Sequence, residues 1–477
     1  MSSCLVLSGC LGGSSGSTAS SGVGGNAAPI AANESVTRAN NCQATDKPET
    51  DIQGRVSKKD RDSGRSQQGY SCNLSLIGQY QGEGATWVNP IYKDCAYMGT
   101  SFSGIPLKAR QGVQVVDVSD PRNPKFATNL TSPAFAIGPW ESLKVNEKRG
   151  LLAGAAVGPI LGAVFLDVYD ISKDCKQPVL LNKLAGNLTL PQTILGHEGG
   201  WSPDGNTYWV TSSRGDIAAI GLEDPTKPKM LYMAAPTNSN HGFEFNADGT
   251  RMYAASINPT GVNIFDVSDI QLRKPNPQIR MVGSLHWSTE GNTQSTIPFT
   301  QNGRQLLVVA DELDTGVVRI LDIQDEKKPV MVSHLKLDIH QASQAATRQS
   351  DNDFKVEGLL GRNGLFGYES HYCTLDSPID PTAMACGYFE SGIRVFDIRN
   401  PSAPQEFAYF NPPAQANKKL QLQGSEHNSP LAGQNADFST DWCTSPPVFK
   451  PNGQLWVVCV DNGFMALEFA PGTYPLK

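Results

Sequence analysis

The fold of this chain follows from residues 112–124, which read Gly112-Val113-Gln114-Val115-Val116-Asp117-Val118-Ser119-Asp120-Pro121-Arg122-Asn123-Pro124. Valine favours strands, and Asp and Pro are common in turns, so the run predicts a short strand followed by a turn. Close copies lie at 261–269, 316–325 and 392–401, and weaker copies lie at 164–172 and 216–225. Such self-similarity indicates an array of equivalent structural units.

Each unit contains four expected strands. The first ends at a polar turn such as 202–205, 246–249, 301–303 or 450–453, and the second follows directly, as at 208–211, 252–255, 306–309 and 455–458. The Val-rich run is the third strand, and the fourth follows the turn after it, as at 228–232 and 329–333. Four short strands joined by Asx-Gly and Asp-Pro turns predict an antiparallel meander.

Counting third strands gives seven units, with third strands at 112–119, 164–172, 216–223, 261–268, 316–323, 392–398 and 463–469. The seventh unit has no fourth strand of its own, because the chain ends eight residues after Phe469. The single strand expected at 74–80 can supply it, which would close the array into a ring and remove its exposed edges. We therefore predict an all-β, seven-bladed β-propeller of four-stranded antiparallel blades, closed by an N-terminal strand.

The third strands resemble the LVIVD-repeat family of bacterial propellers. Residues 113–117 (Val-Gln-Val-Val-Asp) and 393–397 (Ile-Arg-Val-Phe-Asp) match the namesake pattern, and units 2, 3 and 7 match it less well. The resemblance spans roughly residues 70–477 and implies the propeller fold and an extracytoplasmic location. It implies no particular activity, since members of the family are mostly uncharacterised.

The N-terminus predicts a lipoprotein. Leu7-Ser8-Gly9-Cys10 resembles the bacterial lipobox, in which the cysteine is lipidated, and a Gly/Ser-rich stretch follows. The nine residues before Cys10 are shorter than a signal peptide, so we interpret residues 1–10 as a truncated signal. Residues 11–68, which are poor in apolar residues, are expected to be a flexible tether, and residues 69–477 the propeller. These features predict a protein anchored by lipid to a membrane, periplasmic or at the surface of a Gram-negative bacterium.

Composition narrows the partners and the compartment. The formal net charge is −7, which argues against nucleic acid as a partner. Of the ten cysteines, eight remain beyond the leader region and Cys10, and none forms a CxxC pair, which favours disulfides over a zinc ribbon. Cys373 with Cys386 and Cys443 with Cys459 flank strand turns in units 6 and 7, so each pair is a disulfide candidate, with free buried cysteine as the alternative. Elimination leaves Cys72 with Cys95, and Cys42 with Cys175.

One face of the ring carries the candidate site. The loops that enter first strands and those that join second to third strands share a face of a propeller, here called the funnel face. Three of the seven histidines, His197, His241 and His371, fall at equivalent first-strand entries. They could ligate Cu or Zn, with Glu141, Glu198 or Asp441 as further or supporting ligands. The alternatives are that each histidine bonds loop backbone, or that they act in acid–base catalysis.

Further polar residues are expected on the same face, and they are Arg214, Asp311, Glu312, Glu390, His427 and Asp461. Residues 69–477 contain no GxSxG elbow, P-loop or HExxH motif. Three functions stay open: a binding or scaffold module for an unknown protein, small molecule or glycan, a metal-dependent oxidoreductase or hydrolase, and a carbohydrate-active protein that uses the funnel carboxylates.

Overall fold

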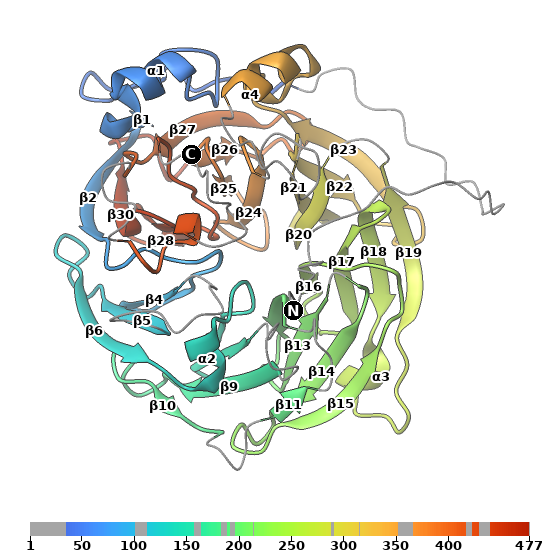
Figure 1. Cartoon of the computed structure of the whole chain (residues 1–477). Coiled ribbons are helices and arrows are strands. Elements are labelled where there is room, and N and C mark those ends of the chain that lie inside the picture. Colours follow the sequence, from blue (N-terminus) through green and yellow to red (C-terminus); the bar gives the residue numbers. More distant parts are fainter. Residues whose placement is uncertain are drawn as a thin grey trace, which may run out of the picture.

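Seven antiparallel sheets surround a common axis in the computed structural model of the chain (Figure 1). The structure describes residues 35–100, 112–156, 164–182, 188–190, 196–212, 214–287, 291–313, 315–351, 366–415, 422–428 and 439–476. The prediction of a seven-bladed propeller is confirmed. Among the described residues, helices long and apolar enough to cross a bilayer are absent.

The first three blades follow one another along the chain, each strand pairing with the next. Blade 1 contains β3 (Ile91–Tyr92), β4 (Cys95–Gly99), β5 (Val113–Asp117) and β6 (Lys125–Leu130). Blade 2 contains β7 (Lys144–Asn146), β8 (Leu151–Ala155), β9 (Val164–Asp170) and β10 (Val179–Leu180), and β11 (Leu188–Leu190) also pairs with β9. Blade 3 contains β12 (Glu198–Trp201), β13 (Thr207–Thr211), β14 (Ile217–Gly221) and β15 (Lys229–Ala234).

The last four blades include the two N-terminal strands. Blade 4 contains β16 (Phe243–Phe245), β17 (Arg251–Ile257), β18 (Thr260–Asp266) and β19 (Arg280–His286), and blade 5 contains β20 (Asn292–Gln301), β21 (Arg304–Glu312), β22 (Val318–Asp322) and β23 (Val330–Leu335). Blade 6 contains β24 (Ser370–Leu375), β25 (Ala383–Tyr388), β26 (Ile393–Asp397), β27 (Gln405–Asn411) and, at its edge, β1 (Tyr70–Cys72). Blade 7 contains β28 (Val448–Lys450), β29 (Gln454–Cys459), β30 (Gly463–Phe469) and β2 (Leu74–Tyr80).

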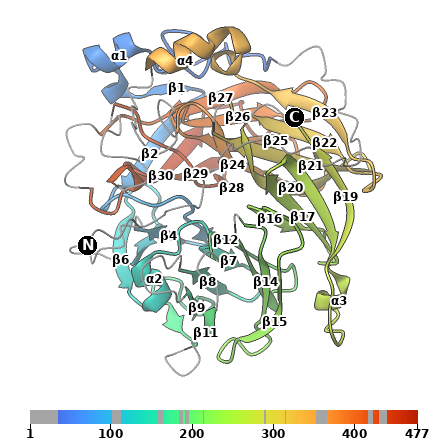
Figure 2. The ribbon, with the colours of Figure 1, turned by 45° about the vertical axis from the view of Figure 1, so that its right-hand side comes forward.

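The described helices are short and lie outside the sheets. They are α1 (Lys58–Ser63), α2 (Pro133–Ile137), α3 (Ser268–Gln271) and α4 (Ala345–Asp351), with 3₁₀ turns η1 (Arg65–Gln68), η2 (Asp338–His340), η3 (Ala342–Gln344) and η5 (Glu426–Asn428). Helices α1 and α4 lie side by side at the rim of the ring in two views (Figures 1 and 2).

The Val-rich motif is structural in every blade where it is clear. Its apolar residues are buried between blades, as Val113 and Val115 are against Leu152 of blade 2. The Asp that ends the strand accepts a hydrogen bond from the backbone N–H two residues later, which fixes the turn. This bond forms at Asp117, Asp170, Asp266, Asp322 and Asp397.

Strand β2 closes the ring as predicted. It pairs antiparallel with β30, from Leu74 opposite Phe469 to Tyr80 opposite Phe464. At Gly78 the strand passes so close to blade 1 that an added Cβ would lie 2.0 Å from the carbonyl oxygen of Pro121, within the turn of the motif. The closing strand therefore packs on the next blade as well as completing its own.

The prediction of a tether over residues 11–68 is wrong for residues 35–68. This segment packs along blades 5 and 6, forming bridges from Ser35 to Lys336 and from Thr37 to Gln405. Helix α1 begins at the Ser57 cap, and its Arg61 pairs with the buried Glu390, 2.9 Å away. Composition misled because the segment has few apolar residues, and buried ion pairs hold it together with the few that it buries, such as Val36 and Val56. Cys10 and the rest of residues 1–34 lie outside the described residues.

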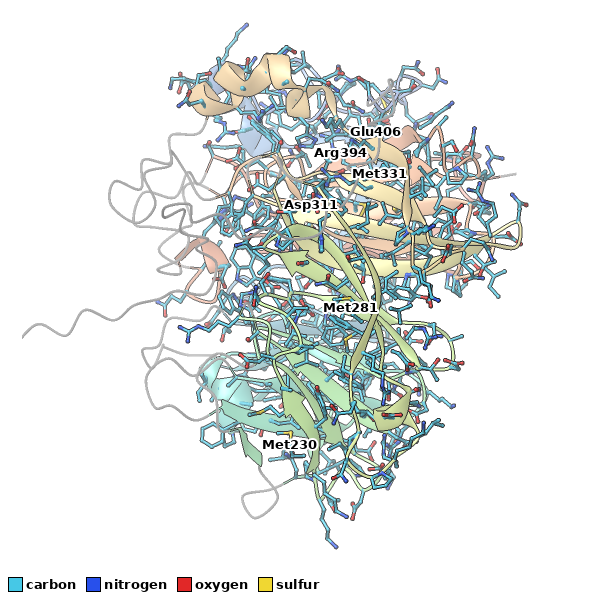
Figure 3. The ribbon with its side chains drawn as sticks, turned by 90° about the vertical axis from the view of Figure 1, so that its right-hand side faces the viewer. Met230, Met281, Asp311, Met331, Arg394 and Glu406 are labelled. Atoms are coloured by element: carbon cyan, nitrogen blue, oxygen red, sulfur yellow. A yellow bond between two sulfur atoms is a disulfide. The ribbon has the colours of Figure 1, made fainter. Side chains whose placement is uncertain are left out.

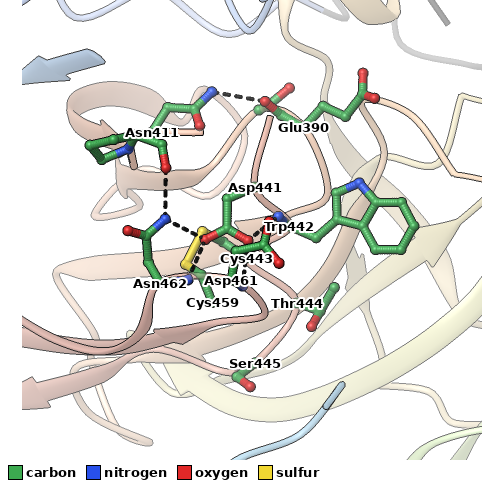
Figure 4. The surroundings of a disulfide bond; sticks show 12 residues. Glu390, Asn411, Asp441, Trp442, Cys443, Thr444, Ser445, Cys459, Asp461 and Asn462 are labelled. Carbon is green, nitrogen blue, oxygen red and sulfur yellow. Dashed lines mark hydrogen bonds between the residues drawn. A yellow bond between two sulfur atoms is a disulfide. The ribbon is translucent and has the colours of Figure 1, made fainter. Parts of the chain in front are cut away.

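Four disulfides join the eight remaining cysteines. Cys373–Cys386 and Cys443–Cys459 form as proposed, the second being drawn in Figure 4. The pairing by elimination was wrong, because Cys42 bonds Cys72 and Cys95 bonds Cys175. The Cys42–Cys72 bond attaches the N-terminal segment to β1, a contact that the expected tether could not make.

We predict that Arg394→Ala lowers the free energy of unfolding by about 3–5 kcal/mol, because it would leave the buried Glu406 without its cation and Glu49 with only the partly exposed Arg38. The Arg394 guanidinium is fully buried and pairs with Glu406 at 3.1 Å and with Glu49 of the N-terminal segment (Figure 3). Urea unfolding would measure the loss.

Arg399→Ala is the matched control, since Arg399 makes a largely exposed pair with Asp397 and should cost at most about 1 kcal/mol. Equal losses in the two variants would contradict the assignment of Arg394 as the buried anchor of the segment.

Candidate functional site

The carboxylate of Glu141 lies at the ring axis between three imidazoles. Its oxygens are 4.0 Å from Nε2 of His197, 3.8 Å from Nε2 of His241 and 3.7 Å from Nε2 of His371. All four side chains are buried. The funnel-face register thus brings together side chains from blades 2, 3, 4 and 6, and we call these four residues the axial centre.

Backbone geometry at the centre is unusual at two points. Trp140, directly before Glu141, has a φ of 46°, and Leu313, directly after Glu312, has a φ of 62°. Bulky residues rarely adopt this left-handed region, and such conformations cluster at functional sites. Each of these two residues is next to a glutamate whose carboxylate points towards the ring axis. Glu141 and Glu312 both lie 3.7 Å from Nε2 of His371.

The protonation of the centre suits metal binding. Burial opposes ionisation of Glu141, but His241, His371 and His197 more than offset it and hold its pKa below the usual range. Gln294 donates to the same carboxylate at 2.7 Å. Burial lowers the pKa of His197, and burial together with His197 lowers the pKa of His241 to about 3. Burial therefore favours neutral imidazoles at His197 and His241 beside an ionised Glu141, which are the forms that bind metals.

Several nitrogen atoms of the centre have no hydrogen-bond partner although they are buried. These are Nε2 of His197, both ring nitrogens of His241 and Nε2 of His371. Nδ1 of His371 lies 3.0 Å from the carbonyl oxygen of Thr444, which can only accept, so Nδ1 donates to it and Nε2 faces Glu141. Unpaired buried polar atoms cost free energy, so their gathering at one point indicates a role other than stability.

A second layer of polar groups supports the centre. The Tyr372 hydroxyl donates to Glu198 and lies 3.3 Å from Glu141, and the Lys144 ammonium pairs with Glu198 at 2.8 Å. Burial raises the pKa of Glu198 to about 8 despite Lys144. Burial and Glu141 also raise the pKa of Glu312 well above its usual value. Burial and the nearby Glu141 carboxylate thus favour the protonated form of Glu312.

An apolar layer of aromatic rings covers part of the centre. Trp140 lies 4.7 Å from the His197 ring, and Trp87 and Phe389 lie 5.7 Å and 5.1 Å from the His371 ring, measured between centroids. These rings belong to a buried cluster that also includes Phe366 and Trp442. They keep the local dielectric low around the imidazoles.

Other residues expected at the site act elsewhere. Asp311 binds Arg319 and the indole nitrogen of Trp287 within blade 5, and Glu390 pairs with Arg61. Arg214 is exposed in the turn after β13. These three therefore belong to structural pairs or to the surface rather than to the axial centre.

His427, Asp441 and Asp461 form a separate buried group in blade 7. Nδ1 of His427 lies 2.9 Å from Asp461. Asp441 accepts four hydrogen bonds, from backbone N–H groups of Trp442, Asp461 and Asn462 and from the Asn462 amide (Figure 4). These donors occupy both oxygens of Asp441. Asp461 also accepts a hydrogen bond from the Ser425 hydroxyl at 2.6 Å, so Asp461 anchors the loop that carries His427.

Sequence reasoning missed Tyr372 and Lys144. Tyr372 directly follows His371. The comparison of equivalent positions across the blades selected His371 and passed over the next residue. Lys144 carries no such signal, because its role depends on Glu198 of the neighbouring blade.

No protein-family model matches the sequence, and no curated protein matches it significantly. Solved structures are similar in fold. A candidate 6-phosphogluconolactonase from Bacteroides uniformis has 13% sequence identity and a TM-score of 0.53, over 80% of this chain and 94% of that one. One from Bacteroides fragilis has 11% identity and a TM-score of 0.50, over 79% and 97% of the two chains. At these identities the likeness establishes only the propeller class, and the LVIVD-repeat resemblance stays a prediction.

In metal-free protein, we predict that His241→Leu changes the free energy of unfolding by less than about 1 kcal/mol, or raises it, because the replaced nitrogens are unpaired. His340→Leu, the matched control, should cost about 1–3 kcal/mol. That buried histidine bonds the Tyr368 carbonyl at 2.8 Å and the Leu337 N–H at 3.3 Å. Chemical denaturation of chelator-treated protein would compare them, and a larger loss for His241 than for His340 would mean that His241 is structural.

Proposed function

We propose that the axial centre binds one transition-metal ion, Cu or Zn, and that the protein is a metal-dependent oxidoreductase or hydrolase. The observation that carries this proposal is the approach of three imidazole Nε2 atoms to within 4.0 Å of one ionised carboxylate. Imidazole suits both metals, and a carboxylate completes a four-ligand set.

The distances support one ion rather than direct hydrogen bonds. Separations of 3.7–4.0 Å are too long for an N–H···O bond. Metal–ligand bonds of ~2.0–2.1 Å in a tetrahedral site put ligand atoms about 3.3 Å apart. Glu141, His197 and His241 each place one ligand atom within 4.8 Å of the other two, and His371 would have to move further than these three to become the fourth ligand.

A metal in this place would supply Lewis acidity or, for copper, one-electron redox chemistry. Around it, Tyr372 and Gln294 orient Glu141, and the aromatic layer excludes water. A scaffold role would leave the unpaired imidazoles without a purpose, so we place it second. The carbohydrate-active alternative is weaker, because Glu141 and Glu198 are both buried and joined through one tyrosine.

We also propose that the protein acts outside the cytoplasm, anchored through lipid on Cys10. Four disulfides support an oxidising compartment. Mass spectrometry of protein from its native host tests the anchor, since an unmodified Cys10 would contradict it.

Elemental analysis of protein purified without chelator tests the metal proposal. We expect close to one Cu or Zn per chain, and its loss in the His197→Ala/His241→Ala double variant, which removes two of the ligands.

His427→Gln is the control, because it alters the separate blade 7 group and should keep the metal. Metal-free wild-type protein would refute the proposal. Metal that survives the double variant but is lost in His427→Gln would move the site to His427 and Asp461.

A further inference from the structure

A pocket of about 330 Å³ lies against the axial centre. Its walls come from first strands and their flanks, including Glu198 of β12, Glu244 of β16, Ile297 of β20 and Leu375 of β24. First strands surround the axis (Figure 1), and their residues line the pocket, so the pocket is part of the central channel. Tyr372 also lines it, and its hydroxyl contacts Glu141 and Glu198. One side chain thus separates the pocket from the centre.

Glu244 is the unsatisfied charge of this pocket. Its side chain is exposed to the channel, and among the described residues no Lys, Arg or His lies within ion-pair distance of it. The one lysine in the wall, Lys144, is held by Glu198 at 2.8 Å and lies over the Tyr372 ring at 4.9 Å. The channel walls around this solvent-accessible carboxylate desolvate it and, only partly offset by Lys144, raise the pKa of Glu244 to about 7. A cation beside this carboxylate would stabilise its ionised form.

The rest of the wall is mainly apolar. Phe243, Ile297, Pro298 and Leu375 line the pocket, and Thr296 adds a hydroxyl. The volume falls at the small end of the range of ligand pockets, and an apolar wall with a few polar anchors is their usual composition. A fitting ligand therefore has a small apolar body and one positive group.

We propose that this axial pocket binds a small organic cation, a primary amine on an apolar body, with its ammonium group on Glu244. The apolar body packs on Phe243 and Ile297 and fills the space towards Tyr372. An organic anion would meet Glu244 and find Lys144 already paired. The binding itself is independent of the metal, whereas its role as the substrate pocket of the axial centre rests on the function proposed above.

Isothermal titration calorimetry with 2-phenylethylamine tests the pocket, using both chelator-treated and metal-loaded protein. We expect saturable binding at one site in both forms, and at least tenfold weaker binding to Glu244→Gln, which keeps the shape and removes the charge. 2-Phenylethanol has the same apolar body without the ammonium group, and it should bind wild-type protein at least tenfold more weakly than the amine.

Glu147→Gln is the control variant, since Glu147 is exposed in the turn between β7 and β8 and should leave the affinity unchanged. The proposal is overturned by absence of saturable amine binding, by unchanged affinity in Glu244→Gln or by equal binding of the alcohol. The alcohol comparison uses wild-type protein and so does not depend on folding of a variant. If protein purified without chelator carries no metal but binds the amine, the metal centre is refuted and the pocket stands. If that protein carries the metal but does not bind the amine, the pocket proposal is overturned and the metal centre stands.

Discussion

The pairing of β2 with β30 is the contact on which the whole arrangement depends. It joins strands about 390 residues apart in the chain, with Ser75 opposite Glu468, and it turns a row of meanders into a ring. Only in a closed ring do the entries of all first strands face one axis. The approach of His197, His241 and His371 to Glu141 is therefore a consequence of closure, since these residues lie in separate blades and share no local sequence.

The axial centre also buries the charge of the Glu141 carboxylate, which formation of the propeller does not by itself require. Glu141 is ionised within a protein interior, and its neighbours are imidazoles whose pKa values burial lowers. Elsewhere the protein pairs its buried charges directly, as Arg394 does with Glu406 at 3.1 Å. The contrast between bonded pairs at the rim and unpaired nitrogens at the axis separates structural polar groups from those available to a ligand. Glu244, in the channel pocket beside the axial centre, likewise has no Lys, Arg or His within ion-pair distance among the described residues.

The sequence predicted what depends on local pattern and register. The fold was predicted from the Val-rich motif, its Asp turn and its seven copies. The three histidines and Glu141 were predicted from equivalent positions in different blades. It failed where a residue's role depends on a distant partner. Arg394 and Glu49 are 345 residues apart, so the ordered segment over 35–68 had no local signature. Asp311 and Glu390 matched the register of the funnel face, yet the buried cations Arg319 and Arg61 engage them, and no periodicity reveals those partners.

The central claim is that the four residues of the axial centre hold one metal ion. Anomalous diffraction from crystals of protein purified without chelator, recorded at the copper and zinc absorption edges, tests it most directly. The account predicts one strong peak on the ring axis, ~2.0–2.2 Å from Nε2 of His197, His241 and His371 and from a Glu141 oxygen. Crystals without a peak there, or with a peak only beside His427 and Asp461, would contradict it.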